Sequence, residues 1–206
     1  KDIKLYKGDI PARFGGRASS VLDIRLKEGS LKKFKGEGGV GVLFSRLTLE
    51  GPIKKDVSSF LISARRSYFD IFLDKSSDVY FQDLSAKLSW QINQKNKLFV
   101  SGYLGSDVMG VTFEQDITQD GETEVVKSET KFKWTNSTAS IRWNHLFSSK
   151  TFMNISAIYS RYDYLLSSEN SGSELTESNA TSFEWTSVAE NWILKADLTK
   201  FINPKT

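Results

Sequence analysis

Three stretches hold residue types that could do chemistry. His145 is the only histidine, so a histidine metal cluster is excluded and a catalytic triad would have to use this one residue. The acids between positions 114 and 124 could offer hard oxygens to Ca²⁺, but their spacing is not that of an EF-hand loop. We interpret that stretch as a solvated loop; its acids are Glu114, Asp116, Asp120, Glu122 and Glu124.

The third stretch, GEGGVG at 36–41, resembles a nucleotide-binding loop. No helical pattern follows it, as a phosphate-binding loop would require. Glycines within a strand, where another part of the chain approaches closely, explain it better. No G-x-S-x-G or H-E-x-x-H pattern occurs. We therefore expect no enzyme, no cofactor and no metal site.

Composition excludes further classes of function. The chain has no cysteine, so neither a disulfide framework nor thiolate chemistry is available. Its 28 basic and 25 acidic residues nearly balance, and no basic run exceeds two residues, which argues against a nucleic-acid partner. No apolar run is long enough for a transmembrane helix, and no signal peptide opens the chain. Both ends of the sequence look cut, so we expect an internal piece of a longer protein.

The elements that would position any site are strands. Between Leu84 and Ile92, LSAKLSWQI alternates apolar and polar residues, which predicts one apolar and one polar strand face. The alternation recurs and predicts about seven strands, which lie near 36–53, 57–70, 80–94, 96–112, 128–147, 151–166 and 182–202. These stretches exceed the 5–6 residues of an ordinary strand and the 9–11 needed to cross a bilayer.

The connections alternate in length. Short turns are expected at 54–56, 93–96, 148–150 and 203–205, and longer loops at 73–80, 114–129 and 167–181. Outer-membrane barrels have short turns on one side of the membrane and long loops on the other. A soluble sandwich has no reason to place long loops on alternate connections.

One early stretch, PARFGGRASSVLDI, resembles the C-terminal end of the plug domain of TonB-dependent outer-membrane receptors. The likeness is to the Bacteroidetes-type branch with a carboxypeptidase-regulatory-like extension. The matching residues are Pro11, Ala12, Arg13, Phe14, Gly15, Gly16, Arg17, Ser19, Ser20, Val21, Leu22, Asp23 and Ile24. Later segments also resemble that family, namely SRLTLEGPIKKDVSSFLISARRSYFD, KLFVSGYLGSD and DLTKFINPKT.

The resemblance implies a 22-strand barrel, filled by a plug, in the bacterial outer membrane. Residues 1–30 would be the plug's last strand and residues 31–206 about a third of the barrel. The implied function is active nutrient uptake (of an oligosaccharide, a peptide or a metal chelate) with outer-membrane lipid as surroundings. The TonB complex would bind a segment outside this chain, and a surface lipoprotein is a possible partner.

Within that framework we expect two groups of site residues. Gly15 and Gly16 allow a tight reversal with positive φ, and arginines beside them would meet carboxylates of the wall. The plug–barrel contacts expected are Arg13, Gly15, Gly16, Arg17, Asp23, Glu50 and Arg65. Arg66 should lie at the membrane edge, where its charge costs little. The membrane-interface residues expected are Arg66, Tyr68, Trp90, Trp143 and Trp192.

Two other functions remain open. A passive or structural outer-membrane barrel would explain the strands without the plug-end motif. A soluble β-rich glycan-binding or adhesin module would explain the aromatic residues and the serine-rich loops, but neither the strand lengths nor the loop asymmetry.

Overall fold

The computed structural model describes residues 2–11, 14–15, 19–72 and 76–202, and its elements are strands with one exception. The prediction of an all-β chain with antiparallel sheets is confirmed. The elements are β1 (Asp2–Lys7), β2 (Ser20–Arg25), β3 (Lys35–Val40), β4 (Phe44–Lys54), β5 (Ser58–Ser67), α1 (Phe69–Phe72), β6 (Ser77–Asn93), β7 (Asn96–Gln119), β8 (Glu122–Ser148), β9 (Thr151–Asn170) and β10 (Thr181–Lys200). Across the described ranges, no helix is long and apolar enough to cross a membrane.

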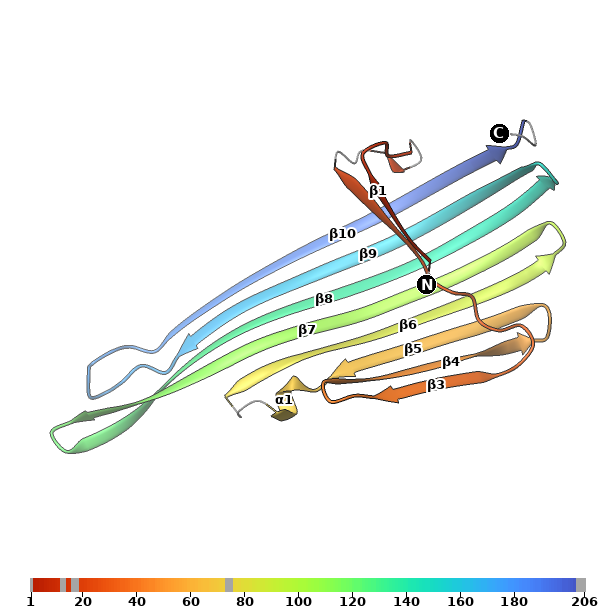
Figure 1. Cartoon of the computed structure of the whole chain (residues 1–206). Helices are drawn as coiled ribbons and strands as arrows, with labels where there is room; N and C mark the ends of the chain where they lie inside the picture. Colours follow the sequence, from red (N-terminus) through yellow and green to blue (C-terminus); the bar gives the residue numbers. More distant parts are fainter. Residues whose placement is uncertain (1, 12–13, 16–18, 73–75, 203–206) are drawn as a thin grey trace.

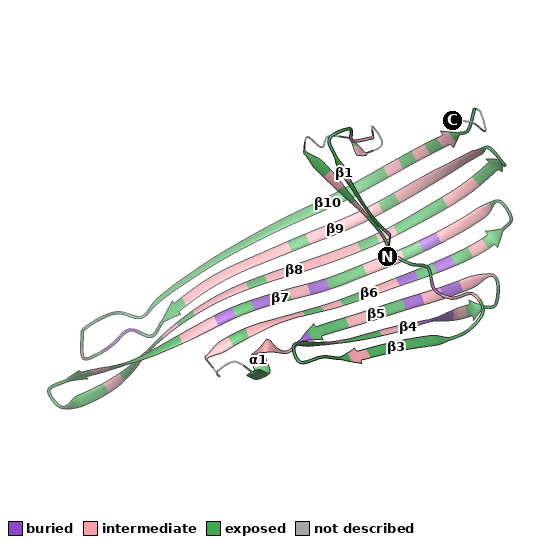
Figure 2. Ribbon diagram, in the orientation of Figure 1, coloured by how far each residue is buried: buried purple, intermediate pink, exposed green. Residues whose placement is uncertain are grey.

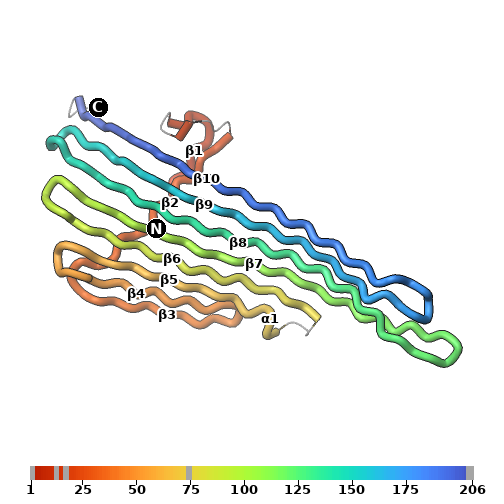
Figure 3. Tube along the Cα trace, turned by 180° about the vertical axis from the view of Figure 1, so that it is seen from behind, coloured from red at the N-terminus to blue at the C-terminus, as the bar shows by residue number. Residues whose placement is uncertain are grey.

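Strands β3 to β10 form one eight-stranded antiparallel sheet in chain order. Each strand pairs with the next one along the chain, so the sheet is a meander in a single layer (Figures 1 and 3). Its two edges are β3 and β10. Nearly every residue of β10 is exposed (Figure 2).

The sheet has eight strands where the sequence pattern predicts about seven. The expected strand at 36–53 is two strands, β3 and β4, because the chain reverses between them and the amide of Gly41 donates to the carbonyl of Phe44 (2.9 Å). Two of the three glycines of β3 lie opposite leucines, Gly36 opposite Leu49 and Gly38 opposite Leu47. The lack of a side chain there gives the leucines room and also hides the strand boundary from a periodicity argument.

The expected acidic loop at 114–129 is wrong. This stretch is the projecting end of the β7–β8 hairpin, paired out to Gln119 and Glu122 (Figure 1). The turn is Asp120–Gly121, with φ of 55° and 86°, the two-residue geometry that favours a tight hairpin. The Asp-Gly dipeptide is the signal that could have predicted it.

The short connections are confirmed where the structure describes them. β4 turns into β5 after Lys54, β6 into β7 after Asn93, and β8 into β9 after Ser148. The fourth expected turn, at 203–205, lies outside the described residues. The other end of the sheet carries the β3–β4 turn, helix α1, the projecting hairpin and the connection from β9 to β10 (Figure 1).

The alternation predicted from the sequence separates the two faces of the sheet. Residues directly opposite one another in a ladder point to the same side. One such row across β6–β10 is apolar: Leu88, Val100, Ile141, Ala157 and Leu194. The row displaced by three residues is polar: Gln91, Lys97, Asn144, Asn154 and Asp197. We call the two sides the apolar face and the polar face.

The first 30 residues contain two strands, where the sequence suggests only one. β1 and β2 pair antiparallel, from Asp2 opposite Arg25 to Lys7 opposite Ser20, as a separate two-stranded sheet. The chain then runs through residues 26–34 to β3. We call residues 26–34 the docked segment, because they lie against the large sheet.

Candidate functional site: the polar face and the docked segment

The docked segment is held on the polar face by lysines and glutamates. Lys87 on β6 donates to the carbonyl of Leu26 (Nζ–O 2.9 Å), and Lys97 on β7 pairs with Glu28 (2.7 Å). Lys87 is only 8% exposed although it is charged. These contacts tie the N-terminal part of the chain to two neighbouring strands of the sheet.

Glu50 forms the matching contact from β4. Its side chain is 6% exposed, and Oε1 accepts a hydrogen bond from Lys27 (3.1 Å) and lies 3.9 Å from Lys35. The other oxygen, Oε2, has no hydrogen-bond partner among the described residues. A buried carboxylate is stable only when it is paired, so Glu50 depends on the docked segment for its main counterion.

Close packing continues along the segment. A side chain at Gly29 would overlap the carbonyl group of Phe60 on β5. The carbonyl of Leu31 accepts from the amide of Asp56 (3.1 Å) at the β4–β5 turn. At the end of the segment, the ring of Phe34 lies 6.2 Å from that of Phe60, which stands opposite Leu88 on the apolar side of the sheet. Only a residue without a side chain allows the backbone to approach this closely at Gly29.

One aromatic ring on the polar face is surrounded by cations. Phe99, 8% exposed, has the guanidinium of Arg142 at 4.4 Å from its centroid. The ammonium groups of Lys97 and Lys87 lie at 4.9 and 5.3 Å. The negative face of an aromatic ring attracts cations, and Phe99 therefore lets three like charges share a small area beside Glu28.

The turn region between β1 and β2 also reaches the polar face. The ammonium of Lys195 on β10 lies 5.6 Å from the ring centroid of Phe14, which packs on Tyr6 at 5.3 Å. The N-terminal part of the chain thus contacts the polar face from β4 to β10. In Figure 1 the β1–β2 hairpin lies in front of the later strands of the sheet.

The expected plug–barrel residues are placed as follows. Arg13, Gly16 and Arg17 lie outside the described residues, and Gly15 has a positive φ of 31°. Asp23 pairs within the hairpin, with Arg25 at 3.3 Å, and not with the sheet. Arg65 faces the polar side but pairs with Asp83 on the next strand at 2.6 Å. Glu50 is the described residue of the sheet in this group that contacts the N-terminal part of the chain. Its partner is Lys27, which the sequence analysis did not identify.

The expected interface residues lie on or next to the apolar face. Arg66 pairs with Asp70 (2.9 Å) and stacks over Tyr80 (4.8 Å to the centroid). The hydroxyl of Tyr68 donates to the carbonyl of Gly41.

The three tryptophans do not share one level. Trp90 and Trp143 belong to one row, since both lie opposite Leu98. Trp192 belongs to a row farther from the short turns, where it lies opposite Tyr159 with the rings 4.7 Å apart.

An aromatic cluster on the polar face was not expected from the sequence. Trp134 stacks on Phe132 (centroids 6.0 Å, planes 13° apart) and touches Tyr164 at 5.8 Å. Tyr162, 37% exposed, follows on β9. The alternation of residues along β8 and β9 does not by itself bring these rings together, because their contact depends on which residues of the two strands pair.

Residues that could have suggested catalysis are engaged otherwise. His145 Nδ1 lies 2.7 Å from Asn96 Oδ1, and its ring packs between Trp143 and Phe147. The acids of the projecting hairpin are spread along two strands, where Glu114 pairs with Lys127 at 2.8 Å. Within the described ranges no three histidines or acids gather as a metal site would require.

Glu124 on β8 binds the connection between β9 and β10 through hydrogen bonds. Its Oε2 accepts from the hydroxyl of Ser173 (2.7 Å) and from the amides of Glu174 (3.0 Å) and Leu175 (3.2 Å). The hydrogen bond from Ser173, together with the two amides, lowers the pKa of the Glu124 carboxyl below its ordinary value. This carboxylate attaches the 171–180 connection to the projecting hairpin.

Comparisons with family models, with curated proteins and with solved structures find no match for this chain.

Proposed function

We propose that the chain is part of a TonB-dependent transporter for active nutrient uptake in a bacterial outer membrane. One observation carries the proposal: the sheet leaves its apolar face exposed and engages the N-terminal part of the chain on its polar face. A soluble sheet of this kind would bury its apolar side and solvate its polar side. The reverse arrangement suits a barrel wall with lipid outside and a plug inside.

The dimensions of the apolar face support a membrane setting. On β6 it runs from Leu84 to Trp90, with Ile92 following at the register shift beside the turn. On β9 it runs from Met153 to Tyr159, after which Arg161 follows. Seven residues of strand extend roughly 20 Å, close to the apolar band of about 25 Å on outer-membrane barrels. The exposed fractions of Leu194 and Trp192 are 81% and 79%, values that water does not favour for such large side chains.

The edges of the sheet support a larger closed structure. β10 is an edge strand of 20 residues whose side chains are almost all exposed. An edge of this length would pair with other chains unless further strands cover it. We propose that additional strands of the same protein pair with β3 and β10 and close the barrel.

The chemistry proposed is binding and gated passage without bond making, and without a cofactor. The partners proposed are outer-membrane lipid, the TonB complex and a surface lipoprotein. The cargo is an oligosaccharide, a peptide or a metal chelate.

A glycan-binding role is the second candidate, because of the aromatic cluster on the polar face. Phe132, Trp134, Tyr162 and Tyr164 offer flat apolar faces of the kind that stack against sugar rings. In a transporter these rings would line the lumen above the docked segment, and in a soluble module they would form the binding surface.

The decisive experiment compares the complete native protein with a variant that lacks everything before Lys35. Both are purified from membranes, and ion conductance is measured after insertion into planar bilayers. The proposal expects a closed native protein and an open variant, because removal of the N-terminal part would empty the lumen. It also expects the native protein to bind the periplasmic domain of TonB.

Other outcomes favour the alternatives. A native protein that conducts as well as the shortened variant indicates a passive barrel. A protein that never partitions into membranes but binds oligosaccharides indicates the soluble module.

A further inference from the structure

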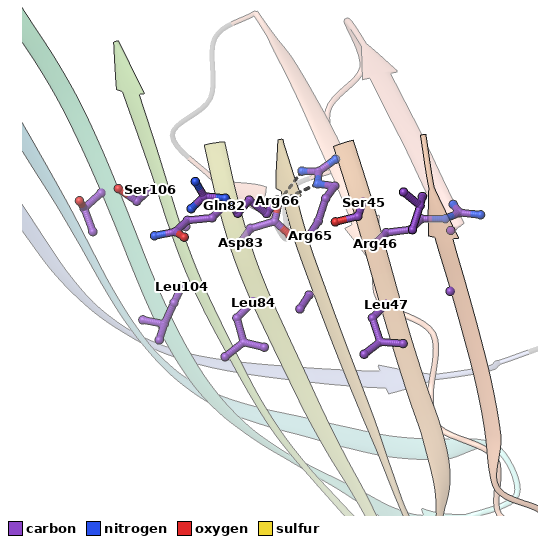
Figure 4. A pocket seen from close by; sticks show the side chains of 16 residues that line it. Ser45, Arg46, Leu47, Arg65, Arg66, Gln82, Asp83, Leu84, Leu104 and Ser106 are labelled. Atoms are coloured by element: carbon purple, nitrogen blue, oxygen red, sulfur yellow. Dashed lines mark hydrogen bonds and ion pairs between the residues drawn. The ribbon is translucent and has the colours of Figure 1, made fainter. Parts of the chain in front are cut away.

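The apolar face contains a groove at the level where it turns polar. The groove has a volume of about 890 Å³ and crosses strands β3 to β8, within the size range of small-ligand sites. Figure 4 shows its two walls at different levels: leucines on one side, and a serine, an arginine and a glutamine on the other.

The strand register explains the two walls. Leu47, Ala64, Leu84 and Leu104 lie opposite one another in one row. The next row toward the projecting hairpin is polar, and its members are Ser45, Arg66, Gln82, Ser106 and Thr135. The residues between the rows, such as Arg65 and Asp83, point to the polar face and contribute backbone to the floor.

The groove is open because small residues stand between the large ones. Gly38 and Ala64 interrupt the leucine row, and Ser45 and Ser106 interrupt the polar row. The nearest side-chain atom to a Cβ placed on Gly38 is Leu47 Cδ1 at 3.8 Å. A thin, flexible chain could therefore lie across the strands against Leu84 and Leu104.

The polar wall offers hydrogen-bond donors. Arg66 uses one nitrogen for Asp70 at 2.9 Å and its face for Tyr80, which leaves further guanidinium donors. The side chains of Ser45, Gln82 and Ser106 make no hydrogen bond within the described ranges. Lys133 lies in the next row, opposite Val108, and has no ion-pair partner among the described residues.

Two carboxylates near this wall have cation partners. Asp70 Oδ2 is held by Arg66, although its buried Oδ1 accepts no hydrogen bond from the described residues, and Asp163, opposite Thr135, is held by Arg161 at 2.7 Å. Asp83 lies on the other face with Arg65. An anion at the polar wall would meet guanidinium, amide and hydroxyl donors, with Lys133 as a nearby unpaired cation.

We propose that this groove binds one phosphate-bearing lipid, with the phosphate on Arg66 and Gln82 and an acyl chain across Leu84 and Leu104. The proposal rests on the proposed function, since it needs the apolar face to lie in a membrane. Charge-assisted bonds from an arginine suit a phosphate, and the leucine row matches a hydrocarbon chain. The site would hold its lipid more tightly than the remaining apolar face does.

The test is native mass spectrometry of the complete protein, purified in mild detergent and titrated with phosphatidylglycerol. Diacylglycerol with the same acyl chains is the probe without a phosphate. Ala64→Phe fills the groove, and Arg66→Gln removes the cation. Ala139→Phe adds the same bulk to the apolar face beside Gly102, outside the groove, and is the matched control.

We expect one phosphatidylglycerol per native protein and much weaker retention of diacylglycerol. Ala64→Phe and Arg66→Gln should each weaken phosphatidylglycerol binding by about tenfold. Ala64→Phe does so by occupying the space of the acyl chain, and Arg66→Gln by removing one charge-assisted bond to the phosphate. Ala139→Phe should bind as the native protein does. Arg66→Lys should restore part of the affinity lost in Arg66→Gln.

Equal phosphatidylglycerol binding by the native protein, Ala64→Phe and Arg66→Gln would overturn the proposal, and so would an equal loss in Ala139→Phe. Flotation of the native protein with phosphatidylglycerol vesicles separates the two levels of inference. A protein that floats but shows no specific lipid contradicts the groove alone, whereas a protein that does not float contradicts the proposed function as well. If Ala64→Phe does not assemble, Arg66→Gln decides the matter.

Discussion

The ammonium of Lys87 on β6 lies 2.9 Å from the carbonyl oxygen of Leu26, 61 residues earlier in the chain. The lysine is almost completely buried, between the docked segment and the ring of Phe99. Because this hydrogen bond joins the sheet to the N-terminal part of the chain, its loss should loosen that part first.

We expect Lys87→Met to lower the free energy of unfolding by about 1.5–3 kcal/mol, the usual contribution of a hydrogen bond from a charged group. Amides of residues 26–34 should also exchange faster with solvent. Chemical denaturation and hydrogen exchange measure the two effects. Lys54→Met, at the exposed lysine that ends β4, should change neither, and similar losses in both variants would contradict the contact.

The second prediction concerns Gly29. A methyl group there would overlap the carbonyl of Phe60, so Gly29→Ala should cost about 1–3 kcal/mol by overpacking. Gly38→Ala is the control, because its methyl group would meet no atom nearer than Leu47 Cδ1, at 3.8 Å. Thermal unfolding compares the two, and equal transition temperatures would show that the segment does not pack against β5.

The third prediction is a pH dependence in the 171–180 connection. The pKa of Glu124 is lower in the folded chain than in the unfolded chain, because the carboxylate accepts three hydrogen bonds. Its contribution to stability is therefore present above the ordinary glutamate pKa and is lost as the pH falls through the lowered value. Protection of the Glu174 and Leu175 amides against hydrogen exchange should follow the same course.

Glu124→Gln should reduce that protection near neutral pH and remove its dependence on acid. Glu122→Gln is a suitable control, since Glu122 is an exposed neighbour on the same strand. Protection that persists in acid in the native chain would exclude the carboxylate as the holding group.

The fourth prediction tests the membrane setting of the apolar face. Ala157 lies between Ile141 and Leu194, and an arginine there should cost about 2–4 kcal/mol if the position lies near mid-bilayer. Ser160, on the same strand, faces the polar side between Thr138 and Asn191. The amount of assembled protein in membranes should fall for Ala157→Arg and stay near native for Ser160→Arg. A larger loss for Ser160→Arg than for Ala157→Arg would contradict lipid on the apolar face.

The sequence predicts the faces of this sheet well, for a local reason. Successive side chains of a strand point to opposite sides, so the alternation from Leu84 to Ile92 already separates apolar from polar residues. The turns after Lys54, Asn93 and Ser148 follow from polar residues between alternating runs. The Asp-Gly dipeptide also predicts the turn at Asp120–Gly121, but the many acids around it favoured the interpretation as a loop.

What the sequence by itself determined is therefore the class of structure: long antiparallel strands with one apolar side. Only the tertiary structure decided which distant residues meet. Glu50 meets Lys27, Arg65 meets Asp83, and the leucine row meets the Arg66 row in a groove. Such contacts depend on strand register and on the path of residues 26–34 across the sheet, and neither is encoded in a pattern that repeats every two residues.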